Sequence, residues 1–308
     1  MATKLPGVKA GRFPGFIEPL LAELRPKAPS ADNWVHEIKY DGYRTQIHIR
    51  DAGIQFFTRR GNDWSERFTA LKGPAGQIQT HGAIIDGEVI VQTPEGQSDF
   101  GALQRELGAG RSKRLVFYAF DLLYLDAHDL RDATLLDRKS VLAELLKGIE
   151  GPLKYSEHLE GEGPKLFRNA CAMGIQGIVS KRKDGRYHSG RNDNWVKATC
   201  RKRDTFFVAG LAENEGKFDG LYLARPEGKT LAYAGKVERG FSEDAKKELR
   251  ARLLKFRAKR SPLAKKIDKP KAQWVKPAVQ VDVEYRALTG EGLLRHPSFK
   301  GLREDLME

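Results

Sequence analysis

The residues best suited to chemistry lie in the stretch Glu-Ile-Lys-Tyr-Asp-Gly-Tyr-Arg, in which the lysine is Lys39. Asp41 and Gly42 follow within a predicted turn, and Arg44 comes on the next strand. A lysine amine is a nucleophile only when it is neutral, whereas a guanidinium binds phosphate through paired donors. The spacing therefore predicts a nucleophile beside a phosphate-binding group, although Lys-x-Asp-Gly alone is also typical of an ordinary hairpin turn.

Alternating apolar and polar residues predict the strands that must position this turn. Residues 34–40 and 44–50 are interpreted as a β-hairpin interrupted at Gly42, where glycine permits an unusual backbone angle, and 54–58 as a third strand. Three further runs of strand length lie at 84–91, 115–123 and 175–181, and a helical pattern lies at 135–146. The mixture of strands and helices, with hairpin-type connections, predicts an α+β fold.

The pattern changes near residue 202, after which the predicted strands are shorter. One helix, predicted over 243–257 with Ser242 as its N-cap, interrupts them. We therefore expect two domains, 1–202 and 203–308, the second a small β-barrel of the oligonucleotide-binding kind. The strands predicted in it are 205–209, 220–224, 231–237 and 279–285.

The charge of the chain indicates a polyanionic partner. Its 308 residues carry 54 Lys and Arg against 41 Asp and Glu, a net charge of +13. Residues 246–276 hold 13 basic and two acidic residues. The apolar stripe of the predicted helix leaves Lys246, Lys247 and Arg250 on its outer face, so we expect them to bind DNA phosphates. The alternative is a solvated basic face.

Two cysteines, Cys171 and Cys200, occur in the chain. Two are too few for a disulfide framework or a four-thiolate zinc site, so both are interpreted as ordinary small residues. No apolar run approaches the roughly 18 residues of a membrane span, and no signal sequence is recognisable at the N-terminus. We expect a cytoplasmic protein that does not enter membranes.

Seven short sequences occur in the same order as the motifs of the covalent nucleotidyltransferases, which they resemble. This superfamily comprises ATP-dependent DNA ligases, RNA ligases and capping enzymes. The last motif resembles the spelling in the ligase domain of bacterial DNA ligase D. The resemblance implies a nucleotidyltransferase (adenylation) domain followed by an OB-fold domain. The motifs lie at 39–44, 58–61, 86–88, 117–123, 176–181, 195–197 and 294–305.

The resemblance also implies three chemical steps. A lysine attacks the α-phosphate of ATP, AMP passes from the lysine to the 5′-phosphate of a nick, and the 3′-hydroxyl displaces AMP. In this chain Lys39 would be the nucleophile, with Asp41 as a catalytic residue of the same motif. Arg44 would contact AMP and the reacting phosphate, and Lys197 the α-phosphate. Nucleotidyl transfer depends on cations around the phosphate, which these residues would supply.

Other motif residues are implied to bind the nucleotide. Phe120 would stack on adenine, Glu88 would bind ribose or metal, and Lys181 belongs to the fourth motif. Arg295 and Arg303 belong to the sixth-motif region, which closes over the β,γ-phosphates in this family.

The resemblance further implies nicked double-stranded DNA as substrate, with Arg59 on the nick 5′-phosphate. Ku and separate repair polymerases are the expected partners. The protein itself is expected to be a monomer associated with the nucleoid. The expected metal is Mg²⁺, with Mn²⁺ as an alternative, held by Glu88 and Gln176. Gln176 stands where the family has glutamate, and Thr199 and Leu306 stand where it often has lysine.

Each of these three differences removes a charge. The sequence therefore leaves two hypotheses open. The first is an active ATP-dependent DNA ligase. The second is a weakened or inactive paralogue that binds DNA ends or nicks as a scaffold. A capping enzyme is a more distant alternative, against which the spelling of the last motif argues.

Overall fold

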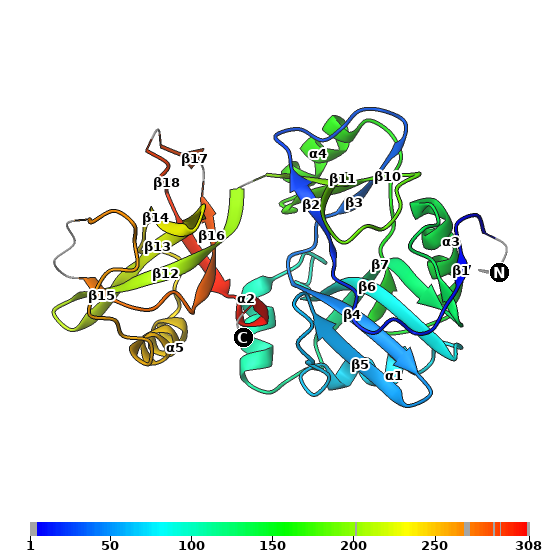
Figure 1. Ribbon diagram of the computed structural model, residues 1–308, viewed down its shortest axis with the longest axis horizontal. Helices are drawn as coiled ribbons and strands as arrows, with labels where there is room; N and C mark the ends of the chain where they lie inside the picture. Colours follow the sequence, from blue (N-terminus) through cyan, green and yellow to red (C-terminus); the bar gives the residue numbers. More distant parts are fainter. Residues whose placement is uncertain (1–4, 201, 268–271, 286, 290, 307–308) are drawn as a thin grey trace. The chain divides into compact units, whose positions relative to one another are not determined.

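The computed structural model describes residues 5–200, 202–267, 272–285, 287–289 and 291–306 (Figure 1). The chain divides into two compact units, Met1–Cys200 and Arg201–Glu308. The expected boundary, after residue 202, is two residues later in the chain than the observed one, after Cys200. No helix within the described ranges has the length and apolar character needed to cross a bilayer.

The larger sheet of the first unit has seven strands in the order β1-β8-β7-β6-β4-β5, with β9 also pairing β7. Helices α1 (Thr69–Ala75), α2 (Phe100–Gly108) and α3 (Leu135–Leu145) pack on this sheet and share one apolar core with it. The strands are β1 (Lys9–Ala10), β4 (Tyr43–Arg50), β5 (Gly53–Thr58), β6 (Gly82–Val91), β7 (Leu115–Leu125), β8 (His128–Asp129) and β9 (Leu153–Tyr155).

The smaller sheet of the first unit has four strands in the order β2-β11-β10-β3. Helix α4 (Gly163–Ala172) packs on it through Leu166, Phe167 and Ala170, which meet Ile178 and Ala198 of the sheet (Figure 1). Its strands are β2 (Leu20–Leu24), β3 (Trp34–Ile38), β10 (Gly177–Arg182) and β11 (Gly190–Thr199).

The hairpin predicted from 34–40 and 44–50 is wrong. Strand β3 pairs with β10, whereas β4 pairs with β5 and β6, so the chain passes from one sheet to the other between them. Alternation fixes which face a residue occupies but not which strand is its partner. Gly42 is required at this crossing because a Cβ there would collide with the backbone carbonyl of Val89 on β6. The constraint is close approach rather than the unusual backbone angle expected from sequence.

The second unit contains a sheet in the order β14-β13-β12-β16-β19, with β15 also pairing β12. Within the described residues this path does not return to its first strand, so the predicted barrel is not closed. Helix α5 (Glu243–Leu254) starts at the predicted cap, where Ser242 Oγ accepts the Ala245 N–H. The remaining elements are β12 (Lys202–Asn214), β13 (Lys217–Glu227), β14 (Thr230–Val237), β15 (Ala272–Trp274), β16 (Gln280–Tyr285), β17 (Ala287–Leu288), β18 (Leu294–Arg295), β19 (Ser298–Leu302) and a 3₁₀ turn at Glu304–Leu306.

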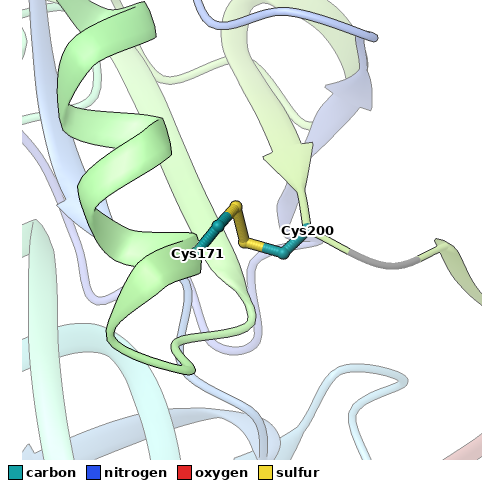
Figure 2. Close-up of a disulfide and its surroundings, with 2 residues drawn as sticks. All are labelled: Cys171 and Cys200. Carbon is teal, nitrogen blue, oxygen red and sulfur yellow. A yellow bond between two sulfur atoms is a disulfide. The ribbon is translucent and has the colours of Figure 1, made fainter.

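A disulfide joins Cys171 to Cys200, so the interpretation of both as ordinary small residues is wrong (Figure 2). Counting cysteines excludes a framework of several bridges but not a single one. The fold brings the pair together because α4 leads directly into β10, which pairs with β11, and Cys200 follows β11. The bridge therefore ties the end of α4 to the end of the strand that carries Lys197.

Removing this cross-link should destabilise the first unit. The cysteines are 29 residues apart, and closing a loop of that size corresponds to about 3–4 kcal/mol in the chain-entropy model. We expect Cys171→Ser/Cys200→Ser to melt below the oxidised native protein. Reductant should lower the melting temperature of the native chain and leave that of the variant unchanged. Equal melting temperatures of the native chain with and without reductant would contradict the prediction.

Candidate active site

One side of the site lies on the four-stranded sheet. The register places Glu37, Val179 and Lys197 side by side across β3, β10 and β11. Lys39 follows Glu37 by two residues, and its N–H donates to Gly177 O at 3.0 Å, which continues the pairing of β3 with β10. Because side chains two residues apart share a face, Lys39 and Lys197 project from the same face of this sheet.

The other side lies on the seven-stranded sheet, where Arg44, Glu88 and Tyr118 are neighbours across β4, β6 and β7. The Arg44 guanidinium donates to both carboxylate oxygens of Asp86, at 2.9 and 2.6 Å. Burial would lower the pKa of Arg44, but the charge and hydrogen bonds of Asp86 outweigh it and raise the pKa above its usual range. Arg44 is therefore a fixed, permanent cation next to Glu88.

Two aromatic rings bring the sheets together. Phe120 of β7 and Trp195 of β11 meet edge to face, with centroids 5.7 Å apart. The Arg44 guanidinium lies 5.0 Å from the Phe120 ring and 5.2 Å from the Trp195 ring. Trp195 is 3% exposed, as expected for a packing residue, and Phe120 is 9% exposed. The ammonium of Lys181, on β10 of the smaller sheet, lies 4.4 Å from the Phe120 ring and 4.1 Å from the Trp195 ring. Cations from both sheets thus share one aromatic pair.

Lys181 also belongs to a buried charge cluster. Its ammonium is 2.9 Å from Glu37 Oε2, and Lys139 of α3 is 2.8 Å from Oε1. Burial lowers the pKa of Lys181 to about 8, with repulsion from Lys139 acting in the same direction. Sequence reasoning missed Glu37 and Lys139. The place of Glu37 on a predicted strand, two residues before Lys39, was the signal for it. Nothing in the sequence pointed to Lys139.

The predicted nucleophile contacts the predicted metal ligand. Lys39 Nζ donates to the side-chain oxygen Oε1 of Gln176 at 2.5 Å, and the backbone carbonyl of Gln176 accepts the Cys200 N–H at 3.0 Å. On the other side of Lys39, the Asp41 N–H donates to Ser98 Oγ at 3.0 Å. Lys39 is therefore held between a neutral amide and a hydrogen-bonded turn.

Both parts of the chain match families of ATP-dependent DNA ligases. The ATP dependent DNA ligase domain matches residues 19–198, and the ATP dependent DNA ligase C terminal region matches residues 214–306. This chain belongs to the ATP-dependent DNA ligases. The expected nucleotidyltransferase domain followed by an OB-fold-type domain is confirmed, apart from barrel closure.

Individual relatives place the ligase near bacterial ligase D. It is 36% identical to the multifunctional non-homologous end joining protein LigD of Pseudomonas aeruginosa over 304 residues, 95% of this chain and 36% of the relative. It is 31% identical to the solved mycobacterial DNA ligase D complexed with ATP and MES, with a TM-score of 0.70 and coverage of 94% and 95% of the two chains. The ligase spans well under half the length of the curated LigD relatives it matches.

The C-terminal motif residues of the ligase lie in the second unit. Arg303 is mostly buried and donates to Asp305 at 2.7 Å and to Asp282 at 3.1 Å, so both carboxylates hold its guanidinium within that unit. Arg295 is exposed at β18. Leu306, where the family often has lysine, is 6% exposed. An apolar side chain suits that buried position.

The remaining predicted DNA-binding cations lie at two places, after β5 and on α5. Arg59 follows β5 directly and is half-buried. On α5, Lys246 forms an ion pair with Glu243 and Arg250 with Glu213, at 2.6 and 2.8 Å. Lys247 is exposed on the same helix. On the face of α5 that is predicted to bind phosphate, Lys246 and Arg250 therefore already have acidic partners.

Proposed function

We propose that this ligase seals nicks in double-stranded DNA during end-joining repair, through lysyl-AMP on Lys39 and a DNA-adenylate. The observation that carries the proposal is that two sheets present complementary groups. One holds Lys39 and Lys197, the other Arg44 and Glu88, and a shared aromatic pair joins them. The names of the LigD relatives support end joining as the setting.

The proposed steps are those that the family resemblance implies. In the first, the Lys39 amine forms a bond to the α-phosphorus of ATP and pyrophosphate leaves. In the second, an oxygen of the nick 5′-phosphate attacks the same phosphorus and releases Lys39. In the third, the 3′-hydroxyl attacks the 5′-phosphate and AMP leaves. Arg44 and Lys197 would stabilise the charge on the phosphate oxygens, and Asp41 completes the first motif.

Glu88 is the carboxylate we propose for Mg²⁺, with Mn²⁺ as the alternative. Mg²⁺ commonly binds through one or two carboxylates together with substrate phosphates. Within the described ranges, no group of three or more His, Cys, Asp and Glu side chains could hold a metal. Glu88 would hold the ion together with the triphosphate, whose charge the ion would neutralise, and Gln176 would add a weak second oxygen donor.

Restoring a carboxylate at position 176 should lower the Mg²⁺ requirement of the first step. We expect Gln176→Glu to lower the Mg²⁺ midpoint for lysyl-AMP formation by about fivefold or more, since one added charge near the ion is worth roughly 1 kcal/mol even in water. Sealing of an already adenylylated nick should change less. Gln97→Glu, which places the same charge on a nearby exposed loop, is the control. Equal midpoints for native and Gln176→Glu proteins would remove Gln176 from metal binding.

The basic face of α5 should bind DNA through phosphates. Reversing Lys246, Lys247 and Arg250 to Glu should weaken nick binding and reduce the slope of log affinity against log salt, with little dependence on base sequence. Reversal of three exposed lysines of the first unit is the matched control. Unchanged affinity in the α5 variant would exclude this face. The control lysines are Lys113, Lys147 and Lys154.

The decisive assay for the proposed function combines α-labelled ATP with a nicked duplex. Label retained on the denatured protein, followed by sealing, supports a ligase. Nick binding without label or sealing would support the scaffold alternative instead. We further propose a cytoplasmic, nucleoid-associated monomer that works with Ku and separate repair polymerases, which rests on the family resemblance.

A further inference from the structure

Tyr187 lies in the connection between β10 and β11, outside all the motifs that the sequence singled out. Its side chain is 3% exposed. The hydroxyl donates to Asp86 Oδ2 at 2.7 Å and accepts the Leu20 N–H at 3.0 Å. It also lies 3.5 Å from Nη2 of Arg44. One buried hydroxyl thus contacts the group that holds the phosphate-binding arginine.

These contacts close into a ring. Arg44 Nη1 donates to the Leu20 carbonyl at 2.9 Å, while Leu20 donates its N–H to Tyr187. Tyr187 donates to Asp86, which accepts two bonds from Arg44. The ring therefore joins β2 of the smaller sheet to β4 and β6 of the larger one. Asp86 is fully buried, so little solvent can replace a missing bond.

We propose that Tyr187 is a positioning residue for Arg44, which it aims at the reacting phosphate through Asp86 and Leu20. The inference rests on the proposed role of Arg44. Asp86 alone fixes the guanidinium to one strand of its own sheet. The Tyr187 hydroxyl adds the link that sets Asp86 relative to the smaller sheet, from which Lys39 and Lys197 project.

The hydroxyl and the ring of Tyr187 have separable roles. The ring meets Trp195 edge to face at 6.0 Å, and the Tyr187 N–H donates to the Arg131 carbonyl at 2.8 Å. Tyr187→Phe keeps both contacts and removes only the hydroxyl. Burial, followed by the charge of Asp86, raises the pKa of Tyr187 well above its usual value, so the hydroxyl stays protonated as a donor.

The test measures single-turnover sealing of a pre-adenylylated nick by the full chain. We expect Tyr187→Phe to slow sealing by about 10- to 100-fold, the range expected for a misplaced reacting group, with a melting temperature lowered by only a few degrees because buried hydrogen bonds are lost. The control is Tyr124→Phe, which removes a buried hydroxyl bonded to the Gly11 carbonyl outside the ring. It should seal within about twofold of the native rate, because no Arg44 contact changes.

A double-mutant cycle separates positioning from a general loss of packing. In an Arg44→Ala background, Tyr187→Phe should cause no further slowing, since the group it positions is absent. A Tyr187→Phe rate equal to that of Tyr124→Phe, equal slowing in both backgrounds, or a variant that no longer folds would each overturn the proposal. If the native chain itself fails to seal, the proposed function fails first, so the two failures are distinguishable.

Discussion

Lys39→Ala should abolish transfer of label from α-labelled ATP to the protein, yet still seal a pre-adenylylated nick at a reduced rate. The covalent bond to AMP forms at the lysine amine, so its removal eliminates the first two steps. The third step uses the 3′-hydroxyl as nucleophile and relies on the remaining cations, Arg44 and Lys197. Denaturing gels of protein incubated with ATP and Mg²⁺ give the first result, and a nick that carries 5′-AMP gives the second.

Two control variants test whether the expected result is specific to Lys39. Lys154→Ala, at an exposed lysine of the same unit, should label and seal as the native ligase does. Arg44→Ala should impair both measurements, because in the proposed steps Arg44 stabilises charge on the reacting phosphate oxygens. Label that persists on Lys39→Ala would identify another lysine as the nucleophile. Complete loss of sealing on the adenylylated nick would mean that Lys39 also acts after AMP has left it.

The sequence predicted the positions of the strands better than it predicted how the strands pair. Strand positions followed from alternation, and the resemblance named Lys39, Arg44 and Glu88 because their types and spacing are short-range features. The partner of β3 is β10, whose first residue, Gly177, lies far along the chain from Ile38. Local alternation carries no information about such a pairing. The predicted hairpin failed for that reason.

The burial of charged side chains is the second feature that the sequence did not predict. Lys181 belongs to a motif, but its ammonium is turned to Glu37 and 2% exposed rather than open to solvent. Lys139 completes the cluster from α3, where a lysine between Arg138 and Ser140 resembles any solvated helical position. Pairing across different elements decides whether such a charge can be buried. Sequence patterns do not report that pairing, nor the approach of Cys171 to Cys200.

A second large effect is expected at Arg138 of α3, which is fully buried with Asp121 of β7. Its guanidinium donates to both oxygens of Asp121, at 2.7 and 2.9 Å, and to the carbonyls of Ala133 and Gly185. Arg138→Met would leave the Asp121 carboxylate without its cation. Breaking a buried pair from one side costs about 3–5 kcal/mol, a large part of the stability of a typical domain.

Urea unfolding followed by tryptophan fluorescence measures this loss, because three of the four tryptophans lie in the first unit. Lys147→Met, which removes the cation of the exposed pair with Glu144, is the control and should cost at most about 1 kcal/mol. Arg138→Met/Asp121→Leu should recover most of the stability, since a buried ion pair can often be replaced by apolar side chains. If Arg138→Met loses no more than the control, Asp121 must be satisfied without Arg138. In that case Arg138 would matter chiefly for its bond to Gly185, two residues before Tyr187, and the variant should slow sealing without unfolding the unit.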